Sequence, residues 1–204
     1  GLDGKTNVAV NASAITTITG TGAEVVAVVS ASGITTATNY AATLSGTSSA
    51  SDTNTVAGDT TGIVTATVTA GTAASLVSSL TNATATDALT LTVNGATATA
   101  ADLITLDGRT SVDVSVTASA VTGTFADLNT VYVTNAANYA NLGDEAITIT
   151  DTQSATNVNT ILGKTSGIVT ATITTATAAS INSALTNGSS SDALTITLSA
   201  GTAA

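Results

Sequence analysis

The chain has 204 residues and a net charge of −10, because 13 acidic side chains stand against only three basic ones. It contains no histidine and no cysteine, which excludes Ser-His-Asp and Cys-His catalytic centres, disulfides, and zinc or haem sites built on these ligands. Three cations cannot neutralise a nucleic-acid backbone or an anionic membrane surface, and no apolar run reaches the roughly 18 residues that span a bilayer. We therefore predict a protein that is not an enzyme, does not bind nucleic acid and does not insert into a membrane.

The chain consists of two copies of one long unit. The recurring strings are LDGKT at 2–6 and LDGRT at 106–110, TGTGAEV at 19–25 and TGTFADL at 122–128, GIVTAT at 62–67 and 167–172, and TDALTLTV at 86–93 and SDALTITL at 191–198. We take residues 1–105 as the first long repeat and residues 106–204 as the second. We expect the chain to be a stretch of a longer array, whose natural termini, signal peptide and anchor lie outside it.

Strict alternation of apolar and polar residues predicts eight strands. In chain order they are Val8–Ala12, Ala42–Ser45, Ile63–Thr69, Leu89–Val93, Val112–Thr117, Ile147–Thr150, Ile168–Thr174 and Leu194–Ser199. One face of each strand is aliphatic, as in Leu194, Ile196 and Leu198, and we expect it to point inward. The other face is rich in threonine, whose branched side chain suits a strand and keeps a hydroxyl toward water.

Short helical turns are expected between the strands, where apolar residues recur three or four positions apart. The segments are TAADLITL at 99–106, TFADLNTV at 124–131, ATNVNTIL at 155–162 and AASINSAL at 178–185. Thr99, Thr124 and Ser154 stand where an N-cap oxygen belongs, and Gly163 suits a C-cap.

Strands that alternate with short helical turns imply parallel pairing, because each crossover returns the chain to the same end. One coil of about 25 residues cannot bury its own apolar face, whereas stacked coils can. We therefore predict a repeat solenoid, a parallel β-solenoid with short helical turns between its strands. Four coils in each long repeat would form one continuous solenoid of about eight coils.

The strings AADLITLDGRTSVDV, TFADLNTV and NYANLGDEAITITDT resemble the Thr/Ala-rich repeats of giant secreted bacterial cell-surface proteins, of the cyanobacterial S-layer and adhesin kind. The likeness covers essentially the whole chain. It implies an extracellular or cell-surface location and a structural role, in proteins that often carry calcium-binding repeats elsewhere. The calcium-binding nonapeptide pattern GGxGxD does not occur in this sequence.

Three acids are the candidate metal ligands, because Asp107, Asp144 and Glu145 fall in loops that lead into strands. Stacked coils would bring these loops into a column, where carboxylates that lie close together could hold calcium. Two other interpretations stay open: solvated loop acids that keep the protein soluble, and a charge ladder in which Glu145 pairs with Arg109 and Lys164. We expect no cofactor other than such a calcium ion.

These observations predict a structural segment of an extracellular repetitive fibre, filament or surface-layer protein. Its partner would be itself, because the two ends of a solenoid differ and head-to-tail contact propagates into a filament. Cell-surface glycans are a further partner class. The alternative function is an ice- or ligand-binding face of an adhesin, formed by the rows of threonine.

Overall fold

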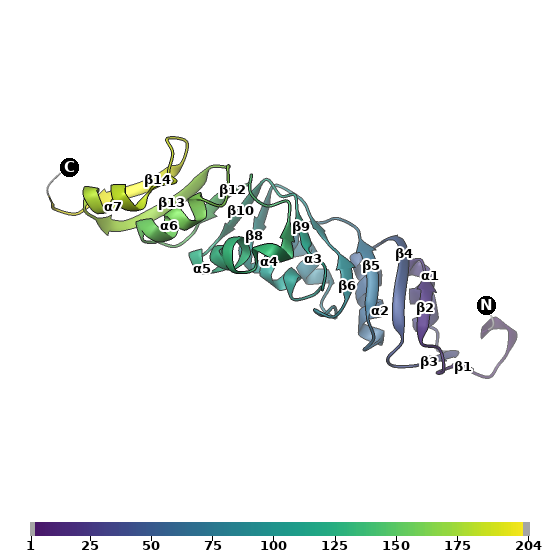
Figure 1. Ribbon diagram of the computed structural model, residues 1–204. Coiled ribbons are helices and arrows are strands. Elements are labelled where there is room, and N and C mark those ends of the chain that lie inside the picture. The colour runs from purple at the N-terminus through teal and green to yellow at the C-terminus, as the bar shows by residue number, and fades with distance from the viewer. Residues whose placement is uncertain (1–2, 202–204) are drawn as a thin grey trace. The chain divides into compact units, whose positions relative to one another are not determined.

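The computed structural model describes residues 3–201 (Figure 1). In this range the chain is an α/β protein with four separate parallel sheets and seven α-helices. It divides into two compact units, of which the first comprises residues 3–71, 75–92 and 105–114 and the second residues 72–74, 93–104 and 115–201.

The first unit is built on a four-stranded sheet with the order β2-β4-β5-β6. Its strands are β2 (Thr17–Gly20), β4 (Ala41–Ser48), β5 (Val64–Val68) and β6 (Ala88–Thr90). All three pairings are parallel, as expected where a helix or a long loop returns the chain after each strand. A separate parallel pair joins β1 (Val10–Ala12) to β3 (Ile34–Thr36).

Side-chain caps begin the first two helices of the first unit. In α1 (Gly22–Val29), Glu24 Oε2 accepts from the Thr21 N–H at 2.8 Å, and Thr21 Oγ1 accepts from the Glu24 N–H at 3.3 Å. In α2 (Ala50–Asp59), Ser49 Oγ accepts from the Asp52 N–H at 3.0 Å. The two helices contact each other and the strands of the sheet (Figure 1). A 3-10 turn at Asp3–Lys5 precedes β1.

The second unit is built on a five-stranded parallel sheet with the order β8-β10-β12-β13-β14. Its strands are β8 (Thr97–Thr99), β10 (Ala120–Gly123), β12 (Ala146–Ile149), β13 (Val169–Ala176) and β14 (Ala193–Leu198). The remaining strands form a small sheet with the order β11-β9-β7, namely β7 (Thr92–Val93), β9 (Val114–Val116) and β11 (Tyr139–Ala140).

The remaining helices are α3 (Ala73–Ser79), α4 (Ala100–Asp107), α5 (Phe125–Asn129), α6 (Ala155–Leu162) and α7 (Ala178–Ala184). A π-helical turn at Thr130–Thr134 and a 3-10 turn at Ala136–Asn138 follow α5. The predicted caps are confirmed, because Thr99, Thr124 and Ser154 each accept from the backbone N–H three residues on. Within the described range no helix has the length and apolar character of a bilayer span.

Alternation decides which face of most strands is buried. Val64, Ala66 and Val68 of β5 are buried, and the two threonines between them are exposed. The same pattern runs through β13, where Val169, Ala171 and Ile173 are buried. The core of each unit is therefore made largely of small and branched aliphatic side chains.

The prediction of one continuous β-solenoid is wrong. The eight predicted strand regions all contain strands, and their pairing is parallel, but the strands are divided among four separate sheets. Parallel strands joined by α-helices fit a Rossmann-like α/β domain and not a β-solenoid. Alternation specifies which face of a strand is buried, but not the sheet in which the strand pairs, so the sequence pattern could not distinguish the two folds. The α/β fold also gives no support to an extracellular location.

Candidate functional site

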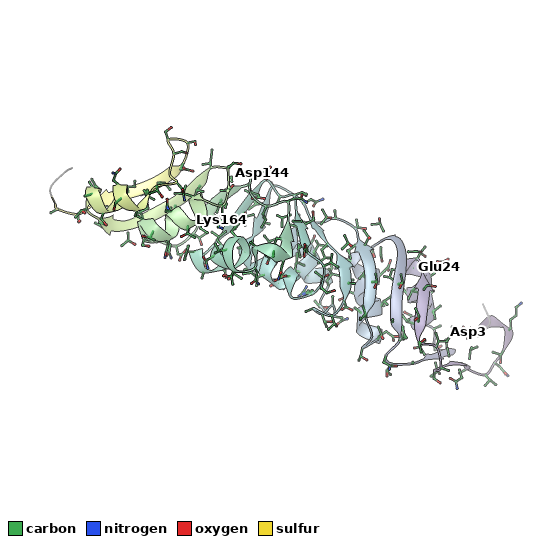
Figure 2. The ribbon with its side chains drawn as sticks, viewed as in Figure 1. Asp3, Glu24, Asp144 and Lys164 are labelled. Carbon is green, nitrogen blue, oxygen red and sulfur yellow. The ribbon has the colours of Figure 1, made fainter. Side chains whose placement is uncertain are left out.

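The three predicted calcium ligands do not belong to one unit. Asp107 is the last residue of α4 and lies in the first unit, whereas Asp144 (labelled in Figure 2) and Glu145 precede β12 in the second. Among residues 3–201 no group of three or more His, Cys, Asp or Glu side chains is placed to hold a metal ion. The part of the predicted cluster that the second unit contains is the pair Asp144 and Glu145.

Glu145 is a buried carboxylate, with 2 % of its surface exposed. Its Oε2 accepts from Tyr132 Oη at 3.2 Å and from the Gly143 N–H at 3.0 Å. Its Oε1 is buried and has no hydrogen-bond partner. Leaving a buried polar atom unpaired costs about 1–3 kcal/mol, so a donor or cation that reached this oxygen would lower the free energy of the folded state.

The loop before β12 holds Glu145 through unusual backbone geometry. Asn141 has a φ of 61° and Gly143 a φ of 125°, and this left-handed region is open mainly to glycine and, less often, to asparagine. Asn141 Nδ2 also donates to Ser115 Oγ at 2.9 Å. The loop therefore aims the Gly143 N–H at the Glu145 carboxylate.

The pKa of the Tyr132 phenol reflects the electrostatics around Glu145. Burial raises the pKa of Tyr132 well above its ordinary value, and the charge of Glu145, the hydrogen bond to it and the charge of Asp144 all raise it further. The phenol is thus held as a neutral donor toward Glu145. Two negative charges act together here, which favours cations over anions.

A hollow of about 490 Å³ adjoins the acidic pair. It is lined by Val116, Thr117, Ala118, Ser119, Asn141, Asp144 and Glu145. Carboxylate, amide and hydroxyl oxygens are the ligand types that hard cations such as calcium take. The lining contains no basic side chain, so the hollow can hold a cation or a hydrogen-bond donor and offers an anion no positively charged partner.

Two aspartates outside the predicted calcium ligands fix the start of corresponding strands in the two copies. Asp87 accepts from the Val64 N–H at 2.9 Å and the Thr84 N–H at 2.8 Å. Asp192 accepts from the Val169 N–H at 2.9 Å and the Ser189 N–H at 2.8 Å. Burial raises the pKa of Asp192, but the hydrogen bonds from Val169 and Ser189 outweigh it and leave the pKa below its ordinary value. The recurrence of TDAL as SDAL was the signal that could have identified them.

Two asparagine pairs also recur. The Asn82 N–H donates to Asn54 Oδ1 at 2.7 Å, and Asn82 Nδ2 donates to the Asn54 carbonyl at 3.2 Å. In the second unit Asn187 makes the same two bonds to Asn159, at 2.7 and 3.1 Å. Each pair joins a helix to the loop that follows the next helix, so these polar groups serve the scaffold.

The predicted charge ladder does not form around Glu145. Arg109 Nη1 donates to the carbonyl oxygen of Val77, and Glu145 is bonded to Tyr132 and Gly143. Lys164 (labelled in Figure 2) is exposed. A backbone carbonyl is an acceptor that charge spacing in a sequence does not reveal.

The recurring strand TDALTLTV/SDALTITL has very different surroundings in its two copies. Leu89, Leu91 and Val93 are each 0 % exposed. At the matching positions Leu194 is half-buried, Ile196 is 44 % exposed and Leu198 is 56 % exposed. Strand β14, which carries these residues, is the last strand of its sheet order. An exposed sheet edge that carries aliphatic side chains is a template for further strand pairing.

A row of threonines crosses the five-stranded sheet of the second unit, and the sequence predicted only two of its members, Thr148 and Thr170, on an outward strand face. Thr99, Thr122, Thr148 and Thr170 are paired in register across four strands. Three of them are exposed and Thr122 is half-buried. The row forms a regular polar face on the five-stranded sheet.

Comparison of the chain with protein-family models, with curated protein sequences and with solved structures gave no match.

Proposed function

We propose that this chain is a structural segment of an extracellular repetitive fibre, filament or surface layer, and that its copies join end to end through the edges of their parallel sheets. The observation that carries the proposal is the exposure of Ile196 and Leu198 on β14, where the matching Leu91 and Val93 are fully buried. Aliphatic side chains on an open sheet edge favour pairing with a further strand.

The internal scaffold supports a mechanical role. The Asp87 and Asp192 clusters and the two asparagine pairs join each strand or helix to the next βα segment along the chain. Hydrogen bonds repeated in this way resist shear between consecutive segments, because each segment is bonded to its neighbour at several points. The extracellular location is part of the proposal and rests on the resemblance to Thr/Ala-rich surface repeats.

Electron microscopy of the purified chain over a range of concentrations tests the assembly. We expect linear chains of particles that lengthen as the protein concentration rises. Single particles at every concentration would contradict a fibre-forming role. Antibody labelling of intact, unpermeabilised cells tests the location, and we expect label on the outer surface.

The in-register row Thr99, Thr122, Thr148 and Thr170 favours a second candidate, an ice-binding face. Regularly spaced hydroxyl and methyl groups along this row could order water against the sheet. Thermal hysteresis of the purified chain is the measurement, with Thr148→Lys as the variant that interrupts the row. Hysteresis that disappears in this variant would favour the second candidate over the first.

A further inference from the structure

We propose that the segment Thr6–Ala12 of a second copy of this chain docks in parallel on the free edge of β14. The inference rests on the proposed function, because it specifies the residues through which copies join. We name a second molecule as the occupant because its segment 2–12 repeats the segment 106–116, which follows the matching strand of the first copy, and the contact is head to tail.

The chain contains its own template for this contact. The Ser111 N–H donates to the Asp87 carbonyl at 2.7 Å. Thr110 Oγ1 accepts from the Leu89 N–H at 3.0 Å and donates to the Leu89 carbonyl at 2.7 Å. Further along, the Thr117 N–H donates to the Val93 carbonyl at 2.8 Å. The segment 110–117 therefore lies along the segment 87–93 in a defined register.

Both partners of this template occur a second time in the sequence. The segment 87–93 returns as 192–198, and LDGRTSVDVSV at 106–116 corresponds to LDGKTNVAVNA at 2–12. A second copy of the covered strand and a second copy of the covering segment are thus both present. Within the described residues neither has the partner that its counterpart has, because β14 pairs with β13 alone and β1 pairs with β3 alone.

Exposure is raised on both of the surfaces that would meet. On the covering segment Val8 is 70 % exposed, whereas the matching Val112 is 38 % exposed. Val10 and Ala12 are half-buried, whereas the matching Val114 and Val116 are fully buried. On the covered strand, Ile196 and Leu198 are exposed, whereas the matching Leu91 and Val93 are fully buried. Docking would remove both sets of aliphatic side chains from water, which is the main driving force for association.

The template fixes the register of the proposed contact. The Asn7 N–H would donate to the Asp192 carbonyl, and the Thr6 hydroxyl would bond to the backbone of Leu194. The Ser13 N–H, which donates to Asn11 Oδ1 at 3.0 Å within its own molecule, would exchange that acceptor for the Leu198 carbonyl. The Asp192 carboxylate is already bonded within its own unit, so only its backbone carbonyl is needed. Because the two surfaces differ, the contact is heterologous and can repeat from molecule to molecule.

Sedimentation velocity on the 204-residue chain and on two variants tests the contact. Ile196→Lys places a charge on the covered edge, and Val10→Lys places one on the covering segment. We expect each variant alone to associate at least 10-fold more weakly than the native chain. The matched controls are Thr195→Lys and Ala9→Lys, which add the same charge to neighbouring exposed positions, and we expect both to stay within 2-fold of the native chain.

Sedimentation velocity of an equimolar mixture of the two variants is the decisive measurement. Ile196→Lys retains an intact covering segment and Val10→Lys retains an intact β14, so the mixture should form a one-to-one dimer that cannot extend. Circular dichroism and thermal melting check that both variants are folded. Thr6→Val, which removes only the hydroxyl that would bond to Leu194, gives a second test of the covering segment and should weaken association several-fold.

Three results would overturn the proposal: a native chain that stays monomeric, association that Val10→Lys leaves unchanged, or a mixture that stays monomeric. Association lost in Ile196→Lys but retained in Val10→Lys would indicate β14 pairing with β14. Other results would contradict the proposed function or this contact separately. If the docked dimer forms but intact cells show no surface label, the contact is supported and the extracellular role is contradicted. If both variants still form linear chains, the fibre is supported and this contact is contradicted.

Discussion

The two copies of the long repeat place nearly the same strand in two different environments. Leu91 and Ile196 occupy matching positions, yet the first is 0 % and the second 44 % exposed. Each strand has the same alternation and the same aspartate at its start, so its own sequence does not account for the difference. What differs is the covering segment, which lies on the first copy at Thr110 and Ser111. Burial in this chain is therefore decided by the next segment along, not by the strand itself.

A second matched pair shows how a substitution changes one position in the repeat. Tyr40 and Glu145 occupy matching positions, because the Thr60 and Thr165 hydroxyls donate to their carbonyls at 2.5 and 2.6 Å. Tyr40 is 0 % exposed and donates from Oη to Asp59 Oδ2 at 2.8 Å. Glu145 keeps one carboxylate oxygen without a partner. The first copy is thus fully satisfied at this position and the second is not.

The largest expected change in the free energy of unfolding comes from truncating the matched residues Leu91 and Ile196. Leu91→Ala should lower the free energy of unfolding by about 3 kcal/mol, because it removes a fully buried side chain and leaves a cavity. Ile196→Ala should lower it by less than about 1 kcal/mol, because much of the side chain is already in water. Urea unfolding of the monomer measures both values. Equal losses would mean that the two environments are energetically alike, against the comparison above.

The aspartate clusters should show a smaller difference in the same direction. Asp87→Asn should cost about 2 kcal/mol and Asp192→Asn about 1 kcal/mol, because each loses an acceptor for a backbone N–H and Asp87 is the more buried. The folded-state pKa of Asp192 lies below its ordinary value. Its contribution is therefore present above the unfolded pKa of about 3.9 and is lost as the pH falls through the folded pKa.

Urea unfolding of both aspartate variants at pH 7 and at pH 3 measures these values. The free energy of unfolding of Asp192→Asn should differ less from that of the native chain at pH 3 than at pH 7. At pH 7, Asp87→Asn shows what the same substitution costs at the more buried aspartate. A difference that stays constant with pH would contradict the ionised role of Asp192.

These pairs also show what the sequence could predict. Alternation located strands such as β5 and β13, and the hydroxyl residues Thr124 and Ser154 located helix starts, because both signals are local. Strands β2, β3, β8, β10 and β11 were not predicted, because each contains at most one apolar residue larger than alanine and therefore shows no alternation. The sequence also predicted Leu194, Ile196 and Leu198 as an inward face, and β14 leaves this face largely exposed.

The candidate site was predicted only in part. Asp144 and Glu145 are adjacent in sequence, so their proximity follows directly. Asp107 was added by assuming that all loops stack in a single column, and the four sheets and two units do not provide that column. The Tyr132 hydroxyl against Glu145 depends on the π-helical turn at Thr130–Thr134, which no sequence pattern indicated.

The substitution Glu145→Gln tests the difference between the matched positions Tyr40 and Glu145. In the presence of a chelator we expect this variant to be more stable than the native chain by about 1 kcal/mol, because a neutral amide is less costly to bury than a carboxylate with an unpaired oxygen. Thermal melting with and without calcium extends the test. If the acidic hollow holds calcium, the ion should raise the Tm of the native chain and leave that of Glu145→Gln unchanged. A variant that is less stable than the native chain in chelator would show that the carboxylate is already compensated.

The last expected effect is small near neutral pH and concerns the two buried phenols, one in each copy. Burial raises the pKa of Tyr40 and of Tyr132 above the ordinary range, and the carboxylates of Asp59 and of Glu145 and Asp144 add to the two shifts. The unfolded chain ionises these phenols near pH 10 while the folded chain keeps them neutral, so stability is complete below pH 10 and falls above it. Tyr40→Phe and Tyr132→Phe should change the stability at pH 7 by only about 1 kcal/mol. Each should also flatten the alkaline limb of a stability profile measured from pH 8 to 11, and an unaltered limb would mean that the phenol ionises freely in the folded protein.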